Sequence, residues 1–186
     1  MGSFPIIATI LSMVLGLSVT RLLLGLVTVF RIRRTSSVDW VPLVWAFVLF
    51  ETQLEYWWAI NQLPTLKPTF TFQEFIFLVL ITLMLFLSAA LLLPSRSEDE
   101  QDGLRSYFER DGRYGLVSYS AFLMLGFAVN VMFMQSPIAS GWAYIDIVMM
   151  ILPIIAFLAK SRRIYATITL VYLPLSVFDT ALSLAP

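Results

Sequence analysis

Six long apolar stretches are the feature that most constrains how this chain of 186 residues can fold. A bilayer core about 30 Å thick is crossed by about 20 residues of α-helix. Hydrophobic residues make up 59% of the chain and charged residues 13%, about half the usual charged share, which excludes a water-soluble domain. The stretches lie near residues 5–29, 41–63, 70–93, 114–134, 141–159 and 164–184. The sequence therefore predicts an all-α, polytopic integral membrane protein, with one six-helix transmembrane domain covering residues 1–186.

Basic residues are distributed unevenly between the predicted loops. Ten of the twelve Lys and Arg residues fall in the loops after the first, third and fifth stretches, whereas the alternate loops contain only Lys67. The positive-inside rule assigns the basic loops to the cytoplasm. We therefore expect both termini on the outer side, with residues 94–113 as the longest cytoplasmic loop. We expect the chain to reside in a bacterial cytoplasmic (inner) membrane.

The chain lacks the residue types on which most catalytic and metal sites depend. It contains no Cys and no His, which excludes thiolate sites, His ligands and His bases. It has no Gly-rich phosphate loop, and its net charge of zero comes without a basic face for nucleic acid. We therefore expect no enzymatic activity, no cofactor, no metal site and no nucleic-acid partner. The expected surroundings are the lipid bilayer.

Ionisable and polar residues inside the apolar stretches are the candidate functional residues, because charges in a membrane are costly and usually have a task or a partner. Glu51 falls near the middle of the second stretch, and Glu55 lies one turn further out on the same helix face. Asn130, Asp146 and Asp179 also fall in the outer halves of their stretches. These depths predict that several carboxylates share the outer half of the membrane.

Arg21 is the one cation within the spans, so it can neutralise at most one of four span carboxylates. Its depth permits an ion pair with Glu51, which would lock the first two spans together or form an inner constriction. The other acids must take up protons, contact water or hold a cation. The sequence predicts an outer-facing vestibule made by Glu55, Asp146 and Asp179, with Glu74 at its mouth and Gln53 and Asn130 as neutral partners.

Two functions fit this pattern. The first is a channel or transporter for protons or a small cation, forming a homo-oligomer because 186 residues give little internal bulk. The alternative is a non-transporting membrane subunit or sensor that docks a cytoplasmic protein through its 94–113 loop. The aromatic run Tyr56, Trp57 and Trp58 leaves a further choice open. It is typical of an interfacial girdle, but its rings could also bind an organic ammonium ion.

Two smaller patterns predict local packing. Ala8, Ser12, Gly16 and Thr20 form a small-residue stripe at four-residue spacing, which favours close helix packing inside the bundle or, alternatively, a homodimer interface. In the long loop, apolar residues at helical spacing within 104–108 predict an amphipathic turn in a solvated loop. The alternative for this segment is a short helix on the inner membrane surface.

Overall fold

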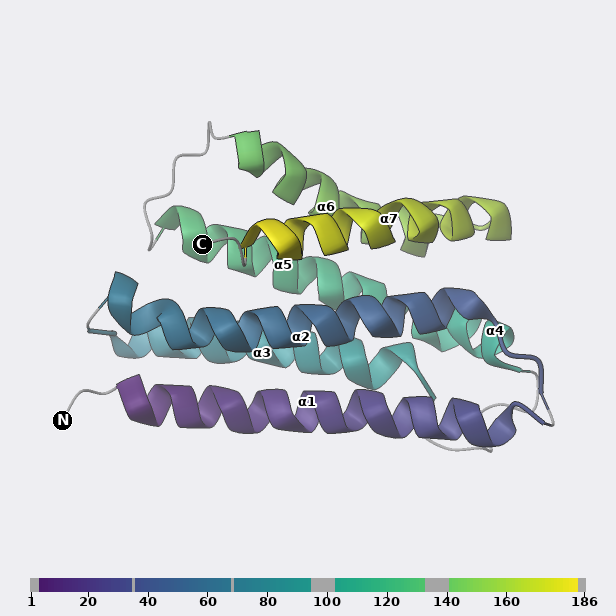
Figure 1. Ribbon diagram of the computed structural model, residues 1–186, viewed down its shortest axis with the longest axis horizontal. Coiled ribbons are helices and arrows are strands. Elements are labelled where there is room, and N and C mark those ends of the chain that lie inside the picture. The colour runs from purple at the N-terminus through teal and green to yellow at the C-terminus, as the bar shows by residue number, and fades with distance from the viewer. Residues whose placement is uncertain (1–3, 35, 68, 95–102, 133–140, 184–186) are drawn as a thin grey trace.

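The computed structural model describes residues 4–34, 36–67, 69–94, 103–132 and 141–183, and its regular elements in these ranges are helical. Long helices lie side by side in one bundle (Figure 1). Their bounds agree with the six predicted stretches to within three residues. The long helices are α1 (Phe4–Ile32), α2 (Trp40–Leu66), α3 (Phe72–Leu92), α5 (Tyr114–Met132), α6 (Gly141–Leu158) and α7 (Arg162–Ser183).

Four of the helices in the described residues are long and apolar enough to cross a membrane. They are α1, α3, residues Tyr114–Val131 of α5 and residues Arg162–Leu182 of α7. The apolar part of α6, Tyr144–Leu158, is shorter, and α2 carries Glu51, Gln53 and Glu55 in its middle. By length and composition the chain is thus an all-helical integral membrane protein.

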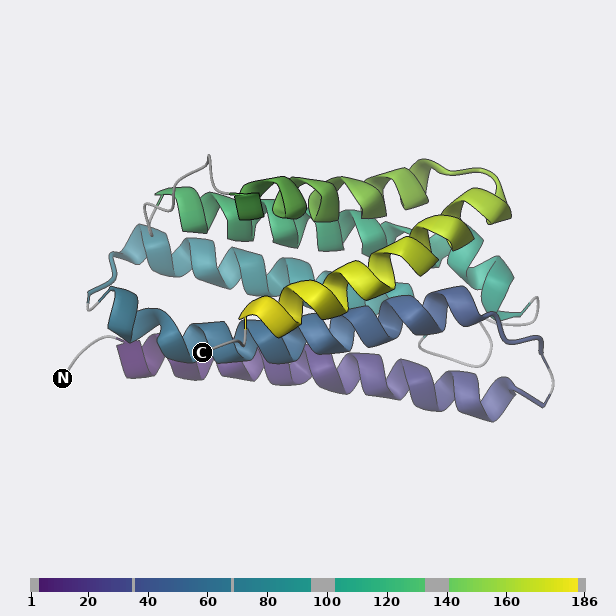
Figure 2. The same cartoon turned by 45° about the horizontal axis from the view of Figure 1, so that its top comes forward.

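Successive long helices run in opposite directions, as the colour gradient in Figures 1 and 2 shows. One end of the bundle, here called the basic end, is formed by the C-termini of α1, α3 and α6 and the N-termini of α2, α5 and α7. Lys67 follows α2 at the opposite end. The described connections and helix termini of the basic end carry Arg31, Arg33, Arg34, Arg105, Arg110, Arg113, Lys160, Arg162 and Arg163.

Helices α2 and α7 run in the same direction and meet through polar side chains. Polar contacts between helices compensate for the weak hydrophobic drive for association in lipid. Each contact joins residues 123 to 125 positions apart, so the two helices lie parallel and in register. From the basic end, the contacts are Asp39–Arg162 at 3.0 Å, Trp45–Thr169 at 2.9 Å, Glu51–Ser176 at 3.4 Å and Glu55–Thr180 at 3.3 Å.

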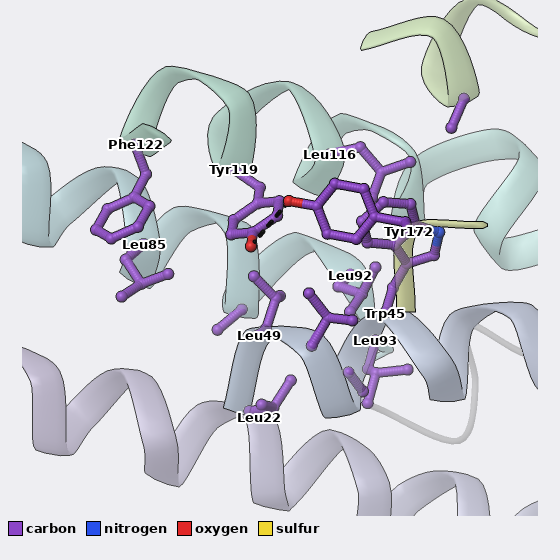
Figure 3. Close-up of a cluster of buried hydrophobic side chains, with 14 of the residues drawn as sticks. Leu22, Trp45, Leu49, Leu85, Leu92, Leu93, Leu116, Tyr119, Phe122 and Tyr172 are labelled. Atoms are coloured by element: carbon purple, nitrogen blue, oxygen red, sulfur yellow. Dashed lines mark hydrogen bonds between the residues drawn. The ribbon is translucent and has the colours of Figure 1, made fainter. Parts of the chain in front are cut away.

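Large buried side chains fill the half of the bundle next to the basic end (Figure 3). Trp45 of α2, Tyr119 of α5 and Tyr172 of α7 are each at most 1% exposed. The Trp45 ring lies 4.7 Å from the Tyr172 ring, and the Tyr172 hydroxyl donates to the Tyr119 hydroxyl at 3.2 Å. This half of the bundle is therefore closed by packed aromatic rings.

Helices α3 and α5 pack closely at Gly115, away from the predicted stripe on α1. A Cβ added at Gly115 would lie 3.0 Å from the Ser88 carbonyl oxygen and 3.2 Å from the Leu92 nitrogen. The Ser88 hydroxyl donates to the Gly115 carbonyl at 2.8 Å. Gly16 is exposed, and a Cβ there would meet nothing within 4 Å. The stripe residue Gly16 therefore does not serve packing inside the bundle.

The described part of the long loop is helical and packs into the bundle, so the expectation of a solvated turn was wrong. Gly103, at φ 88°, precedes α4 (Leu104–Tyr107), which continues as a π-helical turn, η2 (Phe108–Gly112). Leu104 and Phe108 are at most 1% exposed and belong to the main core. Their burial withdraws the apolar side of the segment from both water and lipid. Residues 95–102 of the loop lie outside the described residues.

Candidate binding cavity

A cavity of about 520 Å³ lies in the half of the bundle remote from the basic end. Residues of α2, α3, α5, α6 and α7 line it. Figures 1 and 2 both show α6 and α7 close together at their short connection and diverging towards the opposite end. The cavity therefore occupies the part of the bundle where these two helices separate.

The structure brings together four of the residues that the sequence pointed to. Glu55 of α2, Asn130 of α5, Asp146 of α6 and Asp179 of α7 all line the cavity. The three carboxylate residues are half-buried, and the Thr180 hydroxyl donates to a Glu55 carboxylate oxygen at 3.3 Å. Four different helices thus each contribute one polar group to a common space.

Aromatic rings form one wall of the cavity. The Phe122 ring meets the Tyr56 ring edge-on at 5.4 Å and lies nearly parallel to the Tyr119 ring at 6.3 Å. The Tyr56 hydroxyl is held 2.9 Å from the Thr82 hydroxyl. Trp58 also lines the cavity and is exposed. Part of the aromatic run therefore faces the acidic cavity, in addition to any role at the membrane interface.

The deep end of the cavity is closed by hydroxyl-bearing side chains. Thr52, Tyr119 and Ser176 line it there, with the Thr52 and Tyr119 hydroxyls 3.0 Å apart. Behind them lies Tyr172, which is 0% exposed and packs against Trp45, so the cavity does not continue past it. We call Thr52, Tyr119, Tyr172 and Trp45 the floor of the cavity. Figure 3 shows the packed rings of this floor.

Glu51 and Arg21 are not among the described residues that line the cavity. Glu51 accepts a hydrogen bond from Ser176 at 3.4 Å, in the contact between α2 and α7. Arg21 donates to the carbonyl oxygens of Ala90 and Leu93 at 3.0 and 3.1 Å. The last carbonyls of a helix lack intrahelical partners and favour a nearby cation, which explains this placement at the end of α3. The ion pairs between described residues do not join Arg21 to Glu51.

Gln53 and Glu74 also lie outside the lining of the cavity. Gln53 is 0% exposed, and neither of its side-chain polar atoms has a hydrogen-bond partner among the residues that the structure describes. Glu74 forms a capping box with Thr71 at the start of α3 and an ion pair with Lys67. The Thr-x-x-Glu spacing at 71–74 is a local signal that predicts this capping role.

Several cavity residues carried no signal of their own in the sequence. Thr52, Phe122 and Gly126 are common residue types in membrane helices, and nothing in their spacing marks a site. Ser176 and Thr180 are the exception, because their four-residue spacing matches that of Glu51 and Glu55. If α2 and α7 had been recognised as parallel neighbours, Ser176 and Thr180 could have been paired with Glu51 and Glu55.

A second polar network lies at the basic end, remote from the cavity. The Tyr165 hydroxyl donates to Glu109 at 2.6 Å, Arg105 donates to the same carboxylate oxygen at 2.9 Å, and the Arg113 guanidinium lies 4.7 Å from the centre of the Tyr165 ring. Burial opposes ionisation of Glu109, but the hydrogen bonds from Tyr165 and Arg105 outweigh it and lower the pKa of Glu109. The network fixes η2 against α7.

No protein-family model, no curated protein and no solved structure matches the chain. The chemistry and position of the cavity are therefore the features that indicate a function.

Proposed function

We propose that all six long helices cross the membrane and that the protein carries a proton or small cation from the outer side. The alternating helix directions gather the basic connections at one end, which the positive-inside rule assigns to the cytoplasm. This orientation puts both termini and the wide part of the cavity towards the outer side. In this orientation α2 crosses the membrane beside α7. Hydrogen bonds from α7 partly cover the polar residues of α2.

The single observation that carries the proposal is the convergence of Glu55, Asp146 and Asp179 on one cavity. Among the described residues that line it, none is Lys or Arg. Carboxylates in a cleft with low-dielectric walls create a negative potential that concentrates cations. A cavity of this composition attracts protons and cations and repels anions.

The floor favours a carrier over an open channel. A channel needs a continuous path, whereas Tyr119, Tyr172 and Trp45 fill the bundle between the cavity and the basic end. Passage would require α6 and α7 to change their separation. Each contains a proline, Pro153 or Pro174, which removes a backbone hydrogen bond and permits bending at that point.

The test compares cation or proton flux into proteoliposomes containing the wild type, Glu55→Gln or Glu74→Gln. Glu74→Gln is the matched control, because it removes a negative charge outside the cavity while Gln can still form the capping box at position 74. We expect Glu55→Gln to reduce flux strongly and Glu74→Gln to retain it. Equal flux in the wild type and Glu55→Gln would contradict the proposal.

The second candidate is a non-transporting subunit or sensor that binds a cation in the same cavity. The closed floor is the observation that favours it, because a ligand could bind there without crossing the membrane. Saturable binding in a preparation with no measurable flux would identify this function.

A further inference from the structure

We infer that the cavity takes an organic cation, with an ammonium group attached to an apolar or aromatic body. This inference rests on the proposed function and names the substrate class of the same cavity. It follows from the size of the cavity, the spacing of its acids, the chemistry of its walls and a glycine that leaves space unfilled.

The volume is that of a small-molecule site. At about 520 Å³ the cavity falls within the range of roughly 300–1,000 Å³ that is typical of pockets for organic ligands. A proton relay needs only closely spaced polar groups, and a bare inorganic cation fills a small fraction of such a space. The size therefore favours a ligand with a body of its own.

The acids that line the cavity do not form a three-carboxylate cluster. In the described ranges, no three acidic side chains come close enough together to hold a metal ion. Glu55, Asp146 and Asp179 come from three different helices and face a shared space without forming a ligand cage. Hard cations need several oxygen ligands at short distance, whereas a bulky ammonium ion needs only a negative environment around it.

The walls offer apolar surface next to these acids. Phe122 and its neighbours Tyr56 and Tyr119 present ring surfaces, and Met149 and Met150 of α6 also line the cavity. Aromatic faces attract ammonium groups, and methionine side chains adapt to irregular apolar bodies. A cation with an apolar body satisfies both kinds of lining, which a hydrated metal ion does not.

Gly126 of α5 lines the cavity, and a Cβ built on it would meet nothing within 4 Å. A side chain at this position would therefore begin in the open space of the cavity. Gly16 on the exposed side of α1 has the same open surroundings but lies outside the cavity lining. The two glycines form a matched pair for testing occupancy of the cavity by a ligand.

The experiment measures equilibrium binding of radiolabelled benzyltrimethylammonium to the full chain in lipid nanodiscs. Benzyl alcohol, sodium chloride and benzenesulfonate serve as neutral, inorganic and anionic competitors. We expect saturable binding that only organic ammonium compounds displace at comparable concentrations. Gly126→Leu and Glu55→Gln should weaken it about tenfold or more, whereas Gly16→Leu should leave it unchanged. Thermal midpoints of the variants that are no lower than that of the wild type show that the loss is local.

The outcomes separate this inference from the proposed function. Undiminished binding to Gly126→Leu, or equal displacement by benzyl alcohol, would overturn the organic-cation inference. Absence of benzyltrimethylammonium binding alongside proton or sodium flux that depends on Glu55 would also overturn it, while leaving the proposed function intact. Flux that is insensitive to Glu55→Gln would refute the proposed function whatever the binding result.

Discussion

Replacing Gly115 with Ala, compared with the same change at Gly16, tests the contact between α3 and α5. Ala is favoured over Gly inside a helix by about 1 kcal/mol at either position. At Gly115 the added Cβ would lie 3.0 Å from the Ser88 carbonyl oxygen and 3.2 Å from the Leu92 nitrogen. Backbone atoms cannot rotate away, so the two helices must separate, at a cost of about 1–3 kcal/mol for overpacking. Gly16 has nothing within 4 Å and incurs no such cost.

Because the two variants have the same composition, the propensity gain cancels and Gly115→Ala should be less stable than Gly16→Ala by about 1–3 kcal/mol. In a chain of 186 residues this corresponds to a difference in thermal midpoint of about 2–12 °C. Circular dichroism during heating in one detergent measures both midpoints. Equal midpoints, or a more stable Gly115→Ala, would refute the helix contact described here.

Three further changes test other parts of the structure, each by its thermal midpoint in the same detergent. Tyr119→Phe removes the acceptor of the buried Tyr172 hydroxyl and should cost about 1–3 kcal/mol; no change would contradict the buried hydrogen bond. Asp39→Ala removes the cap of α2 and should cost about 1 kcal/mol, with Asp39→Asn much closer to the wild type. Because the pKa of Glu109 is lowered from its ordinary value of 4.5, ionised Glu109 stabilises the fold at pH values above 4.5. This contribution is lost as pH falls through the lowered pKa, so Glu109→Gln should flatten the acid limb of stability against pH.

The helices were predictable from sequence because a membrane span has a required length and composition. The bounds of the six long helices follow the apolar stretches closely for this reason. The capping role of Glu74 was equally local, since Thr71 lies three residues away. The 103–113 segment was not predictable, because its apolar side chains are satisfied by the core of the bundle and not by water or lipid.

The cavity was predictable only in part, because depth along a helix does not specify which neighbour a side chain meets. Depth predicted that Glu55, Asp146 and Asp179 share the outer half of the membrane, and the three line one cavity in the structure. Glu51 and Glu55 share a helix face and accept hydrogen bonds from Ser176 and Thr180 of α7, but of the two acids it is Glu55 that lines the cavity. Arg21 likewise lies near Glu51 in depth, but it binds carbonyl oxygens at the end of α3. Such choices depend on which helices are neighbours, and hydropathy does not encode this.

The chain contains no Cys, so single-cysteine labelling can test directly whether the cavity is acidic and opens to the outer face. Gly126→Cys would place a thiol in the open space of the cavity, and Leu49→Cys would place one among packed core residues. Positively and negatively charged membrane-impermeant methanethiosulfonates are added to one side of sealed proteoliposomes at a time. We predict that, from the side of the termini, the cationic reagent modifies Gly126→Cys about tenfold or more faster than the anionic one and leaves Leu49→Cys unmodified. Equal rates for the two reagents, or no modification of Gly126→Cys from the side of the termini, would contradict an acidic cavity that opens to the outer face.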